Sequence, residues 1–224
     1  FFEANKAALA RDYLERALAA DSKNEKARLS LGLVCGDGGE VERAKKLLKD
    51  SIRSAGTSFA AHYGLGRLLM AEKKWEEALK EFKNALSARP SPEAHYALGC
   101  VYFQLNRLRM AARHLRKVIE EDRYYIEAFY MLGLVLSRLG EADAARAAFQ
   151  VVSEAETNEP HYRSSARRIL RTGQLPANPK IFGINGDATK ALITGGDRRL
   201  ARVLREAALG AMEVESGSAA VTAR

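Results

Sequence analysis

The dipeptide Leu-Gly recurs along this chain at nearly constant intervals, and this recurrence limits the fold more than any other feature of the sequence. Four copies begin at Leu31, Leu65, Leu98 and Leu132, separated by 34, 33 and 34 residues. A period of this size indicates stacked copies of one small structural unit, because each copy must bury its apolar face against the next.

Three further features recur at fixed distances from these glycines in the sequence. An alanine follows each glycine by twelve residues, a large apolar residue lies four positions later, and a small or β-branched residue three positions after that. With one earlier copy of each, the series are Ala10, Ala44, Ala78, Ala111 and Ala145; Leu14, Leu48, Phe82, Leu115 and Phe149; and Ala17, Ser51, Ala85, Val118 and Val152. Small residues let two helix backbones approach closely, so each unit is predicted to be a helix, a short turn and a second helix.

Turn-forming residues agree with this prediction. Gly39, Asn106 and Gly140 stand where the first helix of a unit must end, and both residue types tolerate a left-handed backbone. Lys73 occupies the equivalent turn of another unit and is an exception. Ser91 followed by Pro92 is typical of a helix start, with a side-chain cap and a proline in the first turn.

The pattern resembles the tetratricopeptide repeat family over about residues 1–172. The segment from Phe59 to Pro92 fits best, through Leu65, Gly66, Ala78, Phe82, Ala85 and Pro90. There are departures from the family pattern. The family's Trp position holds Arg28, His62, His95 and Phe129, and its closing proline occurs only at Pro90. One step is a residue short, which we expect around Pro90-Ser91-Pro92.

The resemblance implies an all-α fold: a right-handed superhelical solenoid of stacked helix-turn-helix repeats, with a C-terminal capping helix and an extra tail helix. The solenoid is expected over 1–172 and a basic linker, an amphipathic helix and a disordered end over 173–224. The parts of the solenoid are a partial repeat 1–24, full repeats 25–58, 59–91, 92–125 and 126–159, and a capping helix 161–172. The tail helix is expected at 197–212, where Leu200, Val203, Leu204 and Ala207 form one apolar stripe beside four arginines.

The resemblance also implies a concave groove lined by the first helix of each repeat, in which such proteins bind a peptide or a partner subunit. Carrying over the family's outward-facing positions gives Leu29, Leu33, Tyr63, Arg67, Met70, Tyr96, Phe103, Gln104, Tyr130, Met131, Leu134 and Arg138. Tyr63, Tyr96 and Tyr130 share one repeat position and are expected to form a ladder, with Glu93 and Glu127 at the rim. The set of Lys, Asn and Arg with which some members hold a partner's C-terminal carboxylate is missing.

The leading functional hypothesis is therefore a scaffold or adaptor that binds protein, not an enzyme, with no cofactor and no metal. His62 and His95 lie in adjacent repeats, too far apart to share a metal ion, and packing roles are expected for both. One alternative is a nucleic-acid-associated protein that uses the Arg-rich second half. Another is a regulatory fragment of a larger enzyme.

The distribution of charge along the chain helps to choose between these alternatives. The net charge is +8, and residues 161–224 contribute +6 of it, so the main body is nearly neutral. Arg109, Arg113 and Arg116 share one helical stripe, but acidic residues follow directly, so a solvated face is favoured over nucleic-acid binding. Self-association through helix 197–212 is a further option for the tail.

Compartment is indicated only by weak signals. The longest apolar run, Ala128 to Leu136, is too short to span a membrane. The two cysteines, Cys35 and Cys100, fit core positions in a reducing compartment, which favours the cytoplasm. The chain opens at Phe1 without methionine, so a targeting segment ahead of it stays an open alternative.

Overall fold

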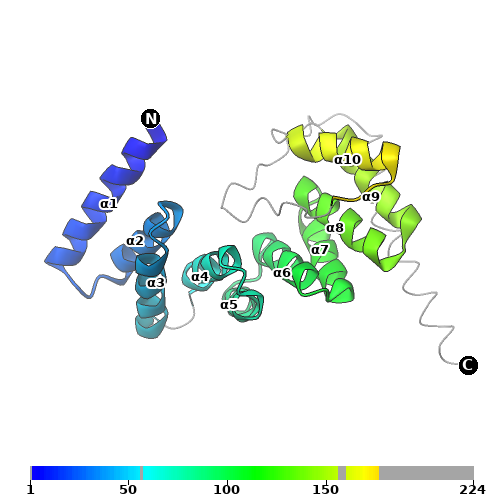
Figure 1. The fold of residues 1–224 in the computed structure, drawn as a ribbon. Helices are drawn as coiled ribbons and strands as arrows, with labels where there is room; N and C mark the ends of the chain where they lie inside the picture. Colours follow the sequence, from blue (N-terminus) through cyan, green and yellow to red (C-terminus); the bar gives the residue numbers. More distant parts are fainter. Residues whose placement is uncertain (1, 56–57, 156–159, 177–224) are drawn as a thin grey trace, which may run out of the picture. The chain divides into compact units, whose positions relative to one another are not determined.

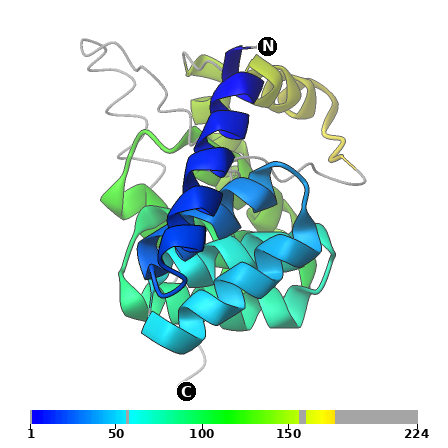
Figure 2. The same ribbon diagram turned by 90° about the vertical axis from the view of Figure 1, so that its left-hand side faces the viewer.

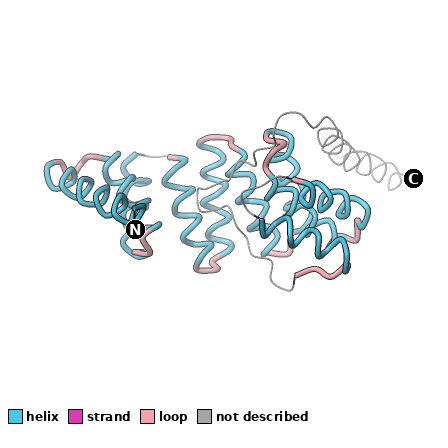
Figure 3. Tube along the Cα trace, turned by 90° about the horizontal axis from the view of Figure 1, so that it is seen from above, coloured by secondary structure: helices cyan, strands magenta, loops and turns pink. Residues whose placement is uncertain are grey.

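The computed structural model describes residues 2–55, 58–155 and 160–176, and all regular secondary structure in these ranges is helical (Figures 1 and 3). The helices are α1 (Phe2–Ala20), α2 (Glu25–Asp37), α3 (Val41–Ala55), α4 (Phe59–Ala71), α5 (Trp75–Ala88), α6 (Pro92–Gln104), α7 (Leu108–Glu121), α8 (Ile126–Leu139), α9 (Ala142–Glu154) and α10 (Pro160–Thr172). The predicted all-α class is confirmed, and α10 corresponds to the expected capping helix. The expected tail helix 197–212 and the end of the chain lie outside the described residues.

The chain divides into two compact units, the first ending at Ala94 and the second beginning at His95. In the first unit, α1 packs on α2, α3 contacts both α2 and α4, α2 also contacts α4 directly, and α5 pairs with α4; Figure 2 shows this unit with α1 foremost. In the second unit, α8 packs against both α7 and α9, and α10 packs on α9 and touches α8. Helices that follow one another in the sequence thus pack together from α1 to α5 and from α7 to α10. The single solenoid expected over 1–172 stays a prediction.

The spacing of helix starts reproduces the sequence period. The second helix of each pair begins sixteen residues after the first: Glu25 and Val41, Phe59 and Trp75, Pro92 and Leu108, Ile126 and Ala142. The step that is one residue short falls in the connection between α5 and α6, where the sequence predicts it. Side-chain caps begin three of the first helices: Asn24 accepts a hydrogen bond from the amide of Ala27 at 3.0 Å, and Ser58 and Ser91 cap α4 and α6 in the same way.

A left-handed residue ends the first helix of every complete pair. Gly39 has φ +82°, Lys73 +60°, Asn106 +56° and Gly140 +83°. The predicted left-handed turns are confirmed at Gly39, Asn106 and Gly140, and Lys73 adopts the same conformation although its residue type does not favour it. The repeat fold therefore places Lys73 in a left-handed backbone conformation that lysine does not itself favour.

A large side chain of the second helix rests on a glycine of the first in each pair. A Cβ at Gly66 would lie 2.8 Å from the Phe82 ring, and one at Gly133 would lie 2.8 Å from the Phe149 ring. Leu48 and Leu115 occupy the same position over Gly32 and Gly99. The alanines that recur in the sequence are buried beside these contacts, at Ala44, Ala78, Ala111 and Ala145. These observations confirm the predicted close approach of the two helices.

The two cysteines occupy the core, as expected. Cys35 and Cys100 are 1% and 0% exposed, and burial raises the pKa of each thiol. A hydrogen bond with Tyr96 opposes this rise at Cys100 but is the smaller effect. Neither thiol therefore has the exposed, stabilised thiolate that a reactive cysteine needs.

Two buried histidines stand at one repeat position but have different partners on the second helix of their pair. His62 Nδ1 lies 2.7 Å from Glu81 Oε2, whereas His95 Nδ1 lies 2.9 Å from His114 Nδ1. The contact between two imidazoles requires one to donate and the other to accept, so it exists only while at least one ring is neutral. The packing roles expected for His62 and His95 are confirmed by their exposure of 6% and 5%.

We expect Lys73→Gly to raise the free energy of unfolding by about 1 kcal/mol, because glycine adopts the left-handed turn without the steric cost that lysine bears there. The reciprocal variant Gly39→Lys places lysine in the same conformation and should lower it by a similar amount. Denaturant titration of both variants measures the two changes. Changes of the same sign in the two variants would contradict this account of the turn.

We expect Gly66→Ala to lower the free energy of unfolding by about 1–3 kcal/mol, because the new methyl group overlaps the Phe82 ring. Gly36→Ala is the matched control, since its Cβ would lie at an ordinary 3.4 Å from Leu68. That variant should be neutral or gain up to about 1 kcal/mol of helix propensity. Thermal melts of the two variants should move in opposite directions or differ clearly, and equal shifts would show that the glycine contact is not tight.

The His95–His114 pair should make the second unit less stable in acid. Burial lowers the pKa of His95 below its ordinary value of 6.5, against the smaller opposing effect of Glu121, with Lys117 and Glu120 also nearby. A histidine whose pKa is lowered in the folded state stabilises the fold above the unfolded pKa and loses that stability as the pH falls. We therefore expect the free energy of unfolding to decline below about pH 6.5.

His95→Gln should flatten this decline, because it removes the second imidazole from the pair. His62→Gln is the control, since His62 faces a carboxylate and not a second imidazole. Urea titrations of the wild type and both variants between about pH 7.5 and 5 measure the slopes. A decline that persists unchanged in His95→Gln would assign the acid sensitivity to other groups.

Candidate functional site

The five groove positions predicted in the first unit lie on its two neighbouring first helices, α2 and α4. Each of the five side chains is partly exposed, whereas the residues around them on α4 are mostly buried. The positions are Leu29, Leu33, Tyr63, Arg67 and Met70. We refer to these five residues as the α2–α4 face.

Close packing of α2 on α4 brings these residues together. Leu33 lies so near the backbone of Gly64 that a Cβ there would be 2.6 Å from its Cδ2 atom. The Tyr63 ring stacks on Phe59 one turn earlier, with ring centroids 5.3 Å apart, and meets the Phe82 ring edge-on at 5.5 Å. These contacts fix the tyrosine ring on the helix surface, so the face offers a preformed aromatic and aliphatic surface.

One ion pair borders the face. Arg67 Nη2 donates to Asp37 Oδ1 at 2.9 Å, and the arginine side chain is 19% exposed while the aspartate is 62% exposed. This pair links the end of α2 to α4. It also balances the guanidinium charge, so the face carries a polar group without a large net charge.

The seven groove positions predicted in the second unit are placed differently. Five of them belong to its core: Tyr96 and Met131 are 0% exposed, Phe103 and Leu134 2%, and Tyr130 5%. Only Gln104, which is half-buried, and Arg138, which is exposed, reach the surface. This burial does not fit an open face at those five positions, so a ligand-binding role for them stays a prediction.

Aromatic packing explains this burial. The Tyr130 ring lies 5.2 Å from the ring of Tyr162 on α10 and 5.9 Å from Phe149. The Tyr96 ring lies 5.0 Å from Tyr125, just before α8. Burial raises the pKa of Tyr96 well above its usual value and also raises the pKa of Tyr130, so both phenols stay protonated.

The place of Tyr162 in this cluster does not follow from the repeat pattern, because the residue has no counterpart in the tyrosine series. Two positions further on, Ser164 stands where the repeat period would place a fourth ladder residue. The helical signal around residue 162 identified a capping helix but not the direction of its side chains. The contact of Tyr162 with Tyr130 is therefore information that only the structure provides.

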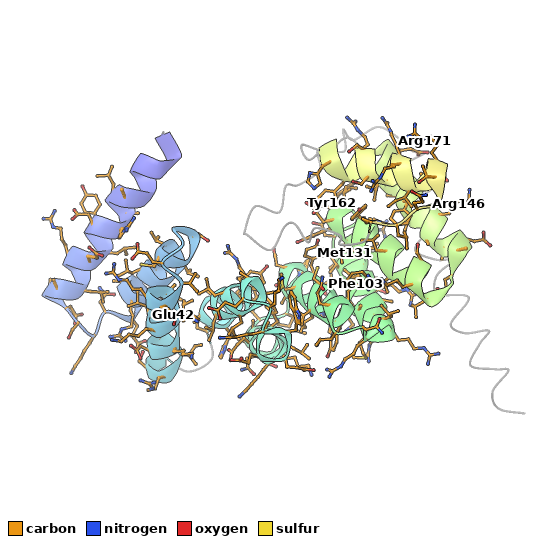
Figure 4. The ribbon with its side chains drawn as sticks, viewed as in Figure 1. Glu42, Phe103, Met131, Arg146, Tyr162 and Arg171 are labelled. Atoms are coloured by element: carbon orange, nitrogen blue, oxygen red, sulfur yellow. The ribbon has the colours of Figure 1, made fainter. Side chains whose placement is uncertain are left out.

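The predicted rim of the groove is also revised. Glu93 is exposed, as expected, but Glu127 is 3% exposed and lies in the core of the second unit. The Arg138 guanidinium lies over the Phe103 ring at 4.2 Å and covers it from solvent. In Figure 4, Phe103 and Met131 lie on the helices α6 and α8 of this unit.

The basic stripe on α7 is partly neutralised. Arg109 and Arg113 are exposed, whereas Arg116 is 13% exposed and its Nη2 lies 3.9 Å from Glu141 Oε2. This ion pair engages Arg116 within the protein, so two of the three arginines of the stripe remain exposed to solvent. The stripe thus has the character of a solvated helix face, and no observation here favours nucleic acid as its ligand.

Neither a metal-binding cluster nor a membrane-spanning helix occurs in the part of the chain that the structure describes. No cluster of three or more His, Cys, Asp or Glu side chains suited to a metal ion occurs there. None of the described helices has the length and apolar character needed to cross a membrane.

Comparison with known families gives three matches that together extend over residues 5–169. Residues 5–85 match the family described as anaphase-promoting complex, cyclosome, subunit 3. Residues 66–106 match a family described as TPR repeat, and residues 102–169 match one described as tetratricopeptide repeat. Human tetratricopeptide repeat protein 7A is 31% identical over 105 residues, which is 46% of this chain and 12% of that protein.

Solved structures with the same fold are also found. The Pseudomonas aeruginosa protein pilF has a TM-score of 0.63 at 18% identity, covering 76% of this chain and 86% of that one. A double mutant of MamA RS-1 has a TM-score of 0.62 at 18% identity, covering 77% and 91%. YrrB, described as a TPR protein with an unusual peptide-binding site, has a TM-score of 0.59 at 20% identity, covering 86% and 97%.

At these identities the structural likenesses concern the fold alone. The family matches agree with the residue period, the paired helices and the left-handed turns described above. Repeats of this kind are typically non-catalytic scaffolds for protein interaction. The chain belongs to the tetratricopeptide repeat family.

Proposed function

We propose that this protein is a scaffold that binds a peptide segment of a partner protein on the α2–α4 face. One observation carries the proposal: Leu29, Leu33, Tyr63, Arg67 and Met70 are partly exposed together on two packed helices. A general protein-binding role is supported by the repeat family, whose members are interaction scaffolds. The proposal goes further in naming the α2–α4 face as the place where the partner's segment binds.

The chemistry of the face indicates the kind of peptide. Leucine, methionine and tyrosine side chains suit apolar side chains of a ligand, and such residues are enriched at the centres of interfaces. Arg67 is already paired with Asp37, so an acidic ligand group would have to compete with that aspartate. An internal segment with apolar anchors therefore fits better than a free C-terminal carboxylate.

Burial in the second unit limits the site. Replacing Tyr96 or Met131 would disturb a core, so a loss of binding in such variants could not be assigned to lost ligand contacts. The residues to test are those of the α2–α4 face. The predicted twelve-residue groove is thus proposed here in a smaller form, centred on the first unit.

We expect the double variant Leu29→Glu, Met70→Glu to weaken peptide binding by at least about tenfold, because apolar ligand side chains would have to desolvate two carboxylates. Random twelve-residue peptides displayed on phage are selected on the wild-type protein, and fluorescence anisotropy measures the affinity of the selected peptides. Lys80→Glu on the outer side of α5 is the control and should leave affinity unchanged. Circular dichroism verifies folding, and equal affinity of the folded double variant would reject the α2–α4 face as the site.

A further inference from the structure

The helix α10 carries an unusual charge pattern for a surface helix. Its thirteen residues include Arg163, Arg167, Arg168 and Arg171 and no acidic residue. These four arginines and Ser164 line an open hollow of about 460 Å³. Among the described residues, none of the four forms an ion pair with a carboxylate, so no carboxylate of those residues balances the positive charge of the hollow.

A second hollow adjoins the first, because Arg171 lines both. It has a volume of about 550 Å³ and is formed by the end of α8 with α9, α10 and the residues after α10. Its apolar lining comes from Ala145, Phe149, Ile169, Leu170 and Leu175, and Leu175 is 38% exposed. Arg146 and Arg171 supply two guanidinium groups at its edge, on α9 and α10 (Figure 4).

A fully solvated cap would explain the arginines but not the apolar hollow beside them. Arg163, Arg167 and Arg171 recur every four residues, and like charges at this spacing slightly destabilise a helix. Arg167 is partly fixed by its Nε, which donates to the backbone carbonyl of Ser153 at 3.2 Å. The arrangement therefore combines a positive surface, one arginine of which is held by a backbone carbonyl, with a recess that can take an apolar side chain.

We propose that this surface, which we call the arginine face (Arg146, Arg163, Arg167, Arg168 and Arg171 with the adjoining apolar hollow), binds an acidic peptide segment of a partner protein. Carboxylates of the peptide pair with the guanidinium groups, and a large apolar side chain enters the hollow above Phe149 and Ile169. Guanidinium groups bind carboxylates through charge-assisted, often bidentate hydrogen bonds. The site lies in the second unit and is separate from the α2–α4 face.

Two features favour a peptide over nucleic acid. Single-stranded nucleic acids are held by exposed aromatic rings on which bases stack. The one aromatic residue lining the apolar hollow, Phe149, is 1% exposed and lies over Gly133, so it offers no stacking surface. The aliphatic groups that line the hollow instead suit an apolar side chain of a peptide.

The test uses the full chain and a fluorescein-labelled nine-residue peptide with a central Leu-Phe pair flanked by glutamates. We expect Arg163→Gln with Arg171→Gln to lower its affinity at least about tenfold, because two charge-assisted hydrogen bonds are lost. This pair of substitutions leaves the Arg167–Ser153 hydrogen bond in place. Arg109→Gln with Arg113→Gln on α7 removes the same charge from an exposed stripe and should leave affinity within about twofold.

Two further arms separate the alternatives. A peptide whose central pair is Ser-Ser should bind at least about tenfold more weakly, because it cannot fill the apolar hollow. Leu29→Glu with Met70→Glu should not change binding of the acidic peptide, so this proposal and the α2–α4 face can fail independently. Equal losses in the two arginine doubles would overturn the site, and so would tighter binding of an oligothymidylate of equal charge or of phosphatidylserine vesicles.

Discussion

In every complete helix pair of the described residues, a large side chain of the second helix lies directly on the backbone of a glycine in the first. This contact sets the distance between the helices, and the recurring buried alanines allow the same distance along the pair. Because the second helix covers one side of the first, the opposite side is left for neighbouring pairs or for a ligand. The location of any binding surface thus depends on which neighbours cover that remaining side.

The two units differ in this respect although they share one repeat. On α2 and α4 the remaining side is partly open, and it carries the α2–α4 face. On α8, all residues from Ile126 to Leu136 are buried, and Tyr162 of α10 packs against Tyr130 on that helix. The proposed arginine face of the second unit accordingly lies on α9 and α10.

Sequence reasoning could predict the features that repeat. The helix pairs, the left-handed turns at Gly39 and Gly140 and the glycine contact of Phe82 follow from spacing, because each recurs and each has a steric cause. Features that occur once were not predictable in this way. Tyr162 stands off the repeat register, and its direction decides the burial of Tyr130. The partners of His62 and His95 also differ, because Glu81 and His114 occupy one position but only the structure shows that they meet the histidines.

The constant interval of sixteen residues between the two helix starts of a pair contrasts with the variable connections that follow the second helix. A deletion inside a pair would move a glycine from beneath its large neighbour, whereas a deletion between pairs leaves that contact intact. The chain shows one such loss, in the connection from α5 to α6. This connection is accordingly a natural place for insertion: a spacer or a reporter domain added near Pro90 would leave every glycine contact within a helix pair in register.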